Sequence, residues 1–206
     1  MLSQSVASEL REAISAGEFQ PGEQLSEVKA AERFHCSRNT LRESFTRLAA
    51  ERIVERIPNR GVFLAMPDTD YIRDLFAARA AIEPAAVRWG AFADAPSLVT
   101  LTSSAFDYAA RGEHNEVSSI NQQFHRKLVA SLGSPTLNEQ MDNLLARMRL
   151  TFLLAIPRYP QLHADHIQGN ITLATLIADG KRLEAATLSH DSLMNTCEKI
   201  LAVLDD

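Results

Sequence analysis

Arginine and small polar residues are spaced along one stretch of this chain in a way that suits contact with a nucleic acid. Arg38 and Arg42 are four residues apart, so on a helix they lie one turn apart on one face. Asn39, Thr40 and Thr46 stand close by, and these residue types hydrogen-bond to base edges and phosphates. The donors crowd into the first two turns, where the positive end of a helix dipole favours phosphate. The stretch therefore predicts a helix that lies in a groove of double-stranded DNA.

The same stretch carries the signals of a stable amphipathic helix. Ser37 is a good N-cap, and Leu41, Phe45 and Leu48 recur at the spacing of one inward stripe. Such a helix with two arginines is common, because a charged stripe usually faces only solvent. The neighbouring segments therefore have to decide between the two interpretations.

Those neighbours predict a winged helix-turn-helix. Upstream, Val6, Leu10 and Ile14 form an apolar helical stripe that is ended by Gly17. Ser26 can cap a short helix that reaches residue 34. Downstream, two β-type runs at 53–57 and 62–64 are joined by a turn segment with a basic tip. Three helices and a two-stranded hairpin are the parts of that fold.

The order of these motifs closely resembles the N-terminal domain of GntR-family transcription regulators. The residues that carry the resemblance are 17–25, Ser26 and Glu27, 37–43, Leu48, 51–54 and 58–61. The resemblance implies a DNA-binding domain over residues 1–66. It also implies DNA contacts from Ser37, Arg38, Thr40, Arg42 and Gly61, to which the residue types add Asn39, Asn59 and Arg60. Some relatives place an arginine where this chain has Val28, and Lys29 is the alternative donor there.

Charge is distributed as a local DNA footprint requires. The chain of 206 residues has a net charge of -5, which disfavours a nucleic acid partner when taken as a whole. Residues 35–66, however, hold six Arg against three Glu, whereas residues 67–206 hold twelve basic against seventeen acidic side chains. The positive charge is thus confined to the predicted DNA-binding helix and wing.

Composition indicates an ordinary globular protein of one large or two small domains, with 46% hydrophobic residues. No signal peptide is recognisable, and no apolar run approaches the ~20 residues of a membrane helix. We therefore expect a cytoplasmic protein without a membrane partner. Cys36 and Cys197 form no ligand-spaced pair and are interpreted as small hydrophobes in a reducing compartment.

Residues 67–206 predict a second, all-helical domain, so that the fold class is mainly α. The expected helices form an antiparallel bundle of six, at 71–92, 96–111, 117–132, 137–152, 163–178 and 181–204. Pro84 is expected to bend the first of them.

This domain resembles the helical effector domain of the FadR-like branch of the same family. The residues that carry the resemblance are 79–83, 121–125, Leu128, Asp165, His166, 176–180, Ala186 and His190. It implies a divalent metal, such as zinc or nickel, held by Asn121, His125, His166 and His190. It further implies a small effector, for which a carboxylate metabolite is the expected class. Asn121 and His125, at i and i+4, share one helix face and are able to ligate such an ion.

Alternatives stay open at several of these positions. Counting back from Gly180 places Asn170 at the third ligand position, with His163 a further alternative to His166, and some relatives hold no metal. Arg79, on an apolar helix face, is expected either to bind the effector or to pair with Glu83 one turn on.

Together these features predict a metabolite-responsive transcription regulator, a repressor by the resemblance, that binds an inverted-repeat operator as a homodimer. A metal-dependent enzyme using the histidines is the alternative class, but the chain has neither a His-Glu-x-x-His motif nor a Gly-rich phosphate loop. A winged helix used only for protein contacts would not need Arg38, Arg42 and Arg60 together.

Overall fold

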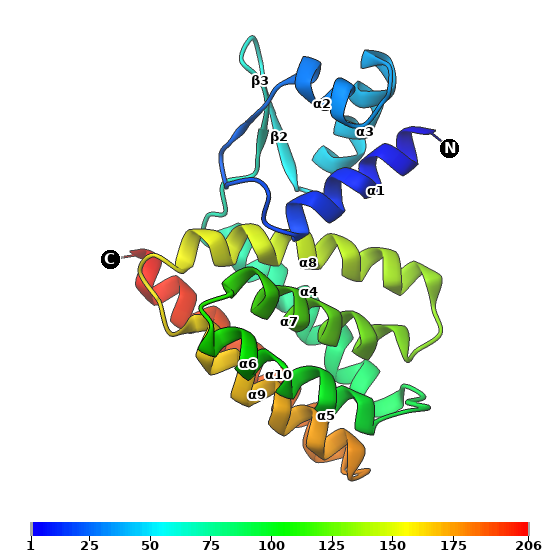
Figure 1. The fold of residues 1–206 in the computed structure, drawn as a ribbon, viewed down its shortest axis with the longest axis vertical. Helices are drawn as coiled ribbons and strands as arrows, with labels where there is room; N and C mark the ends of the chain where they lie inside the picture. Colours follow the sequence, from blue (N-terminus) through cyan, green and yellow to red (C-terminus); the bar gives the residue numbers. More distant parts are fainter. Residues whose placement is uncertain (1, 206) are drawn as a thin grey trace. The chain divides into compact units, whose positions relative to one another are not determined.

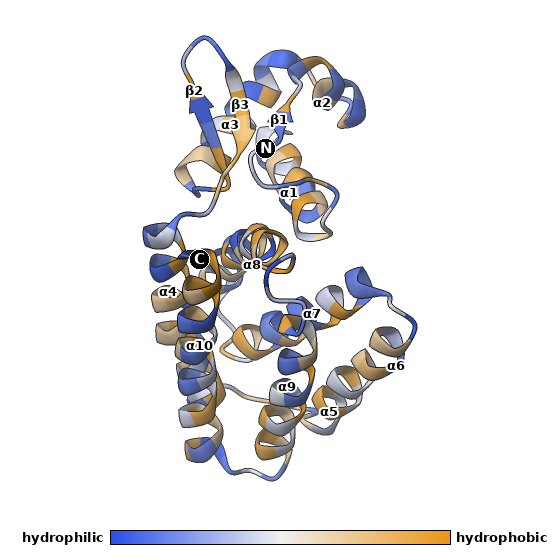
Figure 2. Cartoon of the chain, turned by 90° about the vertical axis from the view of Figure 1, so that its left-hand side faces the viewer, coloured by the Kyte–Doolittle hydropathy of each residue, from blue (hydrophilic) through white to orange (hydrophobic). Residues whose placement is uncertain are grey.

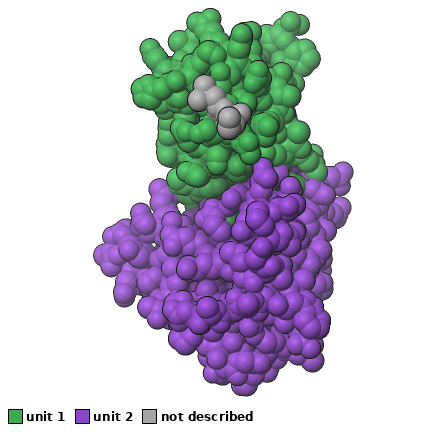
Figure 3. Space-filling view, turned by 90° about the vertical axis from the view of Figure 1, so that its right-hand side faces the viewer, with its two compact units in different colours: residues 1–68, 145–154 green, residues 69–144, 155–206 purple. Residues whose placement is uncertain are grey.

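The computed structural model describes residues 2–205, except for the side chains of Leu2 and His163, and it divides into two compact units (Figure 3). The winged unit comprises residues 2–68 together with 145–154, and the helical unit comprises 69–144 and 155–205. The division in the chain falls after Asp68. Residues 145–154 group with the winged unit, although the expected boundary after residue 66 assigns them to the second domain.

Residues 2–68 of the winged unit contain three helices and a small sheet (Figure 1). Its elements are α1 (Leu2–Ser15), β1 (Gln24–Leu25), α2 (Glu27–Arg33), α3 (Arg38–Ala50), β2 (Val54–Ile57) and β3 (Gly61–Leu64). The strands are antiparallel in the order β1-β3-β2, with Ile57 opposite Gly61 at the hairpin end. The predicted helices and hairpin are present. The strand β1 was not predicted, because two residues are too short to show alternation.

The apolar stripes of α1 and α3 form the core of the winged unit. The expected inward residues are all buried, and they are Val6, Leu10 and Ile14 of α1 and Leu41, Phe45 and Leu48 of α3. At the edge of this core Arg11 donates from Nε and Nη2 to the Glu51 carboxylate, at 3.0 and 2.8 Å. The pair ties α1 to the C-terminal cap of α3, so the polar face of α3 has a fixed support.

Residues 69–205 form one more helix than the six expected. Their helices are α4 (Thr69–Trp89), α5 (Pro96–Ser103), α6 (Ala105–Ala110), α7 (His114–Ala130), α8 (Pro135–Ala155), α9 (Leu162–Ala178) and α10 (Arg182–Asp205). The expected helix at 96–111 is divided at Ser104, where the Ser104 hydroxyl donates to the carbonyl of Leu101 at 2.7 Å. Such local bonds compete with the helical ladder. Pro84 lies inside α4, and the helix continues past it to Trp89.

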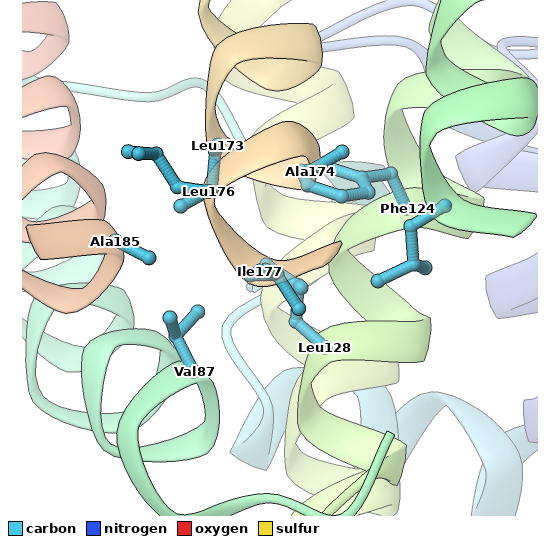
Figure 4. Close-up of a cluster of buried hydrophobic side chains, with 9 residues drawn as sticks. Val87, Phe124, Leu128, Leu173, Ala174, Leu176, Ile177 and Ala185 are labelled. Carbon is cyan, nitrogen blue, oxygen red and sulfur yellow. The ribbon is translucent and has the colours of Figure 1, made fainter. Parts of the chain in front are cut away.

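In the helical unit, α10 packs along α4 and α5 packs along α9. Helix α7 packs against both α4 and α9. Aliphatic side chains and Phe124 from α4, α7, α9 and α10 point toward one another in its main core (Figure 4). A second cluster joins Ala105, Val117, Ile120 and Ile167. These two clusters fix the mutual positions of α7 and α9, which carry most of the predicted ligand residues.

Among the helices described, none combines the length and the apolar character that a membrane span requires.

Candidate nucleic-acid interface and effector pocket

The start of the recognition helix α3 is built by Ser37. Its backbone is extended, and its hydroxyl accepts the N–H of Thr40 at 3.1 Å. The two hydroxyls also lie 2.9 Å apart, so Ser37 and Thr40 form one hydrogen-bonded cap. The cap satisfies a backbone donor that would otherwise lack a helical partner. It leaves the first turn of α3 rigid and at the surface.

Cationic and amide side chains are exposed along α3. Arg38, Asn39 and Arg42 all lie at the surface, whereas the aliphatic face of the helix is buried. Arg42 is anchored by Glu27 of α2, whose carboxylate accepts from Nη2 at 3.0 Å and from Nε at 3.1 Å. The hydrogen bond from Arg42 lowers the pKa of Glu27, against the opposing effect of burial, so the carboxylate is ionised. This face therefore presents several donors and one fixed arginine.

The wing ends in a basic tip at the turn between β2 and β3, which Figure 2 shows in the hydrophilic colour. Asn59, Arg60 and Gly61 are exposed there. Gln24 Nε2 donates to the Arg60 carbonyl at 2.7 Å, and the Arg60 guanidinium lies 5.5 Å from the centre of the Phe63 ring. Gly61 has a φ of +110°, which a residue with a side chain rarely adopts. The tip thus holds Arg60 outward on a constrained turn.

One position near this face departs from the family pattern. Val28 is 54% exposed, so an aliphatic side chain stands where some relatives have an arginine. Lys29 is exposed one residue later, and its backbone N–H donates to the Ser26 hydroxyl at 3.4 Å. Glu27 was not predicted as part of this site. In the sequence, Ser26 and Glu27 carried only part of the resemblance to the GntR family.

Several of the predicted ligand residues line one pocket in the helical unit. Asn121 of α7 and His166 and Asn170 of α9 line it, together with Thr102 at the end of α5. The remaining lining is apolar and comprises Ala105, Val117, Ile120 and Ile167. Asn170 donates from Nδ2 to Asn121 Oδ1 at 2.6 Å, which joins α9 to α7. The pocket is small and mostly apolar, with room for about one water molecule, and its polar groups are two carboxamides, an imidazole and a hydroxyl.

Arg79 and His125 belong to a buried ion-pair network on Glu83. Arg79 Nε donates to Glu83 Oε1 at 2.6 Å, and His125 Nδ1 lies 2.7 Å from Glu83 Oε2. Burial alone would raise the pKa of Glu83, but the charges of Arg79 and His125 and their hydrogen bonds lower it to about 2. Glu83 is therefore an anion in the core. Of the two alternatives for Arg79, the structure displays the ion pair with Glu83.

The four residues expected to hold a metal are not brought together. His190 of α10 has a side chain that is 53% exposed and lies 3.1 Å from the Asp191 carboxylate. Asn121 Oδ1 already accepts from the Asn170 amide. The side chain of His163 lies outside the described residues. Across the described chain no group of three or more His, Cys, Asp or Glu is arranged to hold a metal ion.

This donor set does not fit a divalent ion. A zinc or nickel site in a protein needs several converging nitrogen, sulfur or carboxylate ligands. Here the pocket supplies His166 and neutral amides, and none of the described residues that line it is a carboxylate. The sequence placed Asn170 at a ligand position by counting, and the structure brings it into the pocket as an amide partner of Asn121. Thr102 was not predicted, because a threonine in a short apolar helix gives no signal.

An exposed basic recognition helix and wing, in one chain with an all-helical unit, define a DNA-binding transcription regulator of the winged helix-turn-helix type. The comparisons with known proteins agree. The family model "Bacterial regulatory proteins, gntR family" matches residues 2–64, and the FCD domain model matches residues 74–194. The chain belongs to the GntR family of transcription regulators, and to its members with an FCD domain.

Relatives with established names are regulators and not enzymes. The Nta operon transcriptional regulator of Aminobacter aminovorans is 25% identical over 90% of this chain and 88% of its own. The HTH-type transcriptional repressor GlaR of Escherichia coli is 28% identical, with 88% of both chains covered. A GntR-type regulator from Rhodococcus sp. RHA1 has a similar structure, with a TM-score of 0.82 and 28% identity over 97% of both chains. The fold is shared with E. coli McbR/YncC, at a TM-score of 0.79 and 18% identity.

Proposed function

We propose that this protein is a repressor that binds an inverted-repeat operator as a homodimer and responds to a small polar metabolite held in the helical unit. The observation that carries the proposal is the exposed row of Arg38, Asn39 and Arg42 on a capped helix, beside the basic wing tip. A two-fold pair of such helices reaches successive major grooves about 34 Å apart. Two of the named relatives are repressors, GlaR and the galactonate operon transcriptional repressor, which supports the sign of regulation.

The DNA contacts we propose are those expected from the sequence. Arg38, Asn39 and Arg42 read base edges from α3, while Ser37 and Thr40 contact phosphate with groups that the cap leaves available. Asn59, Arg60 and Gly61 contact the backbone or the minor groove from the wing. Because phosphate contacts release counterions, operator affinity should fall steeply with salt.

The effector site we propose is the small pocket between α5, α7 and α9, which has room for about one water molecule and must widen to admit a metabolite. Its polar lining, which includes Asn121, His166 and Asn170, both donates and accepts hydrogen bonds. A small carboxylate remains the proposed class, but its oxygens would be bound by neutral N–H donors, because Arg79 is paired with Glu83 outside the pocket lining. Coupling between effector and operator is typically about 1–3 kcal/mol, which changes occupancy several-fold to a hundredfold.

Selection from genomic DNA tests the regulator. The full chain is mixed with fragmented DNA of its own genome, and the retained fragments are sequenced. We expect a few fragments that share an inverted repeat. Arg38→Ala should bind these about ten- to a hundredfold more weakly, as the loss of a base contact predicts.

Arg47→Ala is the matched control for this experiment. Arg47 lies on the same helix, nine residues from Arg38, and at about 100° per residue it points to the opposite side. Arg47→Ala should therefore retain the operator almost as wild type does. Equal losses of operator affinity in the two variants would contradict the proposed DNA-binding face of α3. The homodimer is tested on a sizing column at micromolar concentration, and elution as a monomer both with and without operator would contradict it.

A further inference from the structure

Glu27 stands at an unusual place for an acidic side chain, inside the surface that we propose to face DNA. It is the first residue of α2, and Ser26 caps that helix with its hydroxyl on the Lys29 N–H. Its carboxylate accepts hydrogen bonds from Nε and Nη2 of Arg42, with oxygen–nitrogen distances from 3.0 to 3.2 Å. The Arg42 side chain is 59% exposed and that of Glu27 is 34% exposed. A carboxylate near phosphates opposes binding, so its presence here calls for a physical reason.

Fold stability does not supply that reason. Exposed ion pairs contribute little to stability, because water screens them and two side chains must be ordered. The core of the winged unit is formed by other residues, and α1 is tied to the end of α3 by the separate Arg11–Glu51 pair. The Glu27–Arg42 pair therefore acts mainly on Arg42 itself.

The bond pattern determines which donors of Arg42 remain. A guanidinium group carries five N–H donors, and Glu27 accepts hydrogen bonds from the edge formed by Nε and Nη2. The opposite edge, formed by the two terminal nitrogens, keeps donors that match the O6 and N7 acceptors of guanine in the major groove. Because the guanidinium is held by two bonds, it loses less freedom when it meets a base.

The backbone of Arg42 is fixed as firmly as its side chain. Its carbonyl accepts from Thr46 Oγ1 at 2.8 Å and from Arg56 Nη2 at 2.7 Å. Arg56 belongs to β2, so the wing strand as well as α2 holds this residue in place. The charge of Glu27 also offsets that of Arg42, which makes Arg42 a weak phosphate anchor and a directed base reader.

From this geometry we infer that Glu27 is a positioning residue for sequence discrimination, which aims the Arg42 guanidinium at a guanine in each half-site. The inference rests on the proposed DNA-binding function. It adds that Arg42 reads a guanine and that Glu27 makes this contact selective. Glu27 lowers affinity for any DNA while raising the preference for the operator.

The experiment compares operator and random duplexes of equal length, with the operator taken from the wild-type genomic selection. Glu27→Gln removes the charge, and Glu27→Asp keeps the charge at the start of α2 but shortens its reach. Glu32→Gln is the matched control, because Glu32 is an exposed residue of α2 with the same charge. Affinity is measured over a range of salt concentrations for wild type and each variant.

We expect Glu27→Gln to bind random duplex several-fold more tightly at low salt, with a salt slope steeper by up to about one. The ratio of operator to random affinity should fall by about tenfold in both Glu27 variants, which lies within the value of one bidentate base contact. Glu32→Gln should keep the wild-type ratio.

A chemical substitution in the DNA separates positioning from a general structural effect. Replacing single operator guanines by 7-deazaguanine removes the N7 acceptor, and wild type should lose about tenfold affinity at one guanine of each half-site. Arg42→Ala and Glu27→Gln should lose less than about threefold at that same guanine. Specific binding with an unchanged ratio in both Glu27 variants, or no guanine coupled to Arg42, overturns this inference alone. A wild-type chain that retains no duplex overturns the proposed function, and this inference with it.

Discussion

Removing the buried anion Glu83 gives a prediction that can be worked out from the structure. Glu83 is fully buried and Arg79 is 2% exposed, and the Nε–Oε1 distance between them is 2.6 Å. Glu83→Gln keeps the shape of the side chain but leaves the Arg79 guanidinium without its counter-charge. Losing one partner of a buried pair is costly, because the remaining charge has no water to compensate it.

The pKa of Glu83 sets the size of the effect. It falls from an ordinary 4.5 to about 2 in the folded protein, a shift of about two and a half pH units. At about 1.4 kcal/mol per unit, ionised Glu83 stabilises the fold by about 3 kcal/mol. Because the folded pKa is the lower one, this stability is present above pH 4.5 and is lost as the pH falls toward 2.

Urea unfolding followed by far-ultraviolet circular dichroism measures the difference between wild type and Glu83→Gln. We expect the variant to be less stable by about 3 kcal/mol near neutral pH, with the difference shrinking steadily below pH 4.5. Glu113→Gln is the control. Glu113 also has a pKa lowered by its bond to an arginine, Arg111, but the pair lies at the surface, so the substitution should change little.

Two results would refute this reasoning. One is a Glu83→Gln variant as stable as wild type near neutral pH, which would mean that Arg79 finds compensation elsewhere. The other is a difference that stays constant down to acidic pH, which would show that the cost comes from packing and not from charge.

The remaining predictions concern the wing, the helix cap and the metal. Gly61→Ala should destabilise the wing by about 1 kcal/mol, seen as weaker operator binding with an intact helical signal, because φ is +110° and a Cβ would lie 3.2 Å from Gln24 Nε2. Ser37→Ala should lower the free energy of unfolding by about 1 kcal/mol through loss of the bond to the Thr40 N–H, whereas Ser192→Ala, at an exposed position of α10, is the control of equal size. Dialysis against a chelator should change neither the unfolding temperature nor operator affinity, and stoichiometric zinc or nickel in the purified protein would contradict our interpretation of the pocket.

Much of the winged unit could be predicted because its signals are local. The spacing of Leu41, Phe45 and Leu48 and the cap at Ser37 predicted α3, and the structure confirms both the buried stripe and the cap. The contact between Glu27 and Arg42 could not be predicted. It joins residues fifteen positions apart on two helices, and only their packing brings the two charges together.

The pocket was predicted less well, because its residues come from separate helices. The spacing of Asn121 and His125 places both on α7, yet Asn121 lines the pocket while His125 binds Glu83. The resemblance to metal-binding relatives implied His190 as a fourth ligand, whereas the structure has it exposed beside Asp191. A shift of about two residues along a helix rotates a side chain by about 200°, which is enough to turn it away from a shared centre, and no local pattern records it.

The double use of the Arg42 carbonyl limits how this DNA-binding surface can change during evolution. Thr46 and Arg56 both donate to it, and Glu27 holds the side chain of the same residue. A new operator preference is therefore hard to acquire by exchanging α3 alone, since the transplanted helix would lose its partners in α2 and β2. We expect the smallest segment that transfers recognition between relatives to extend from Glu27 through the wing tip at Gly61.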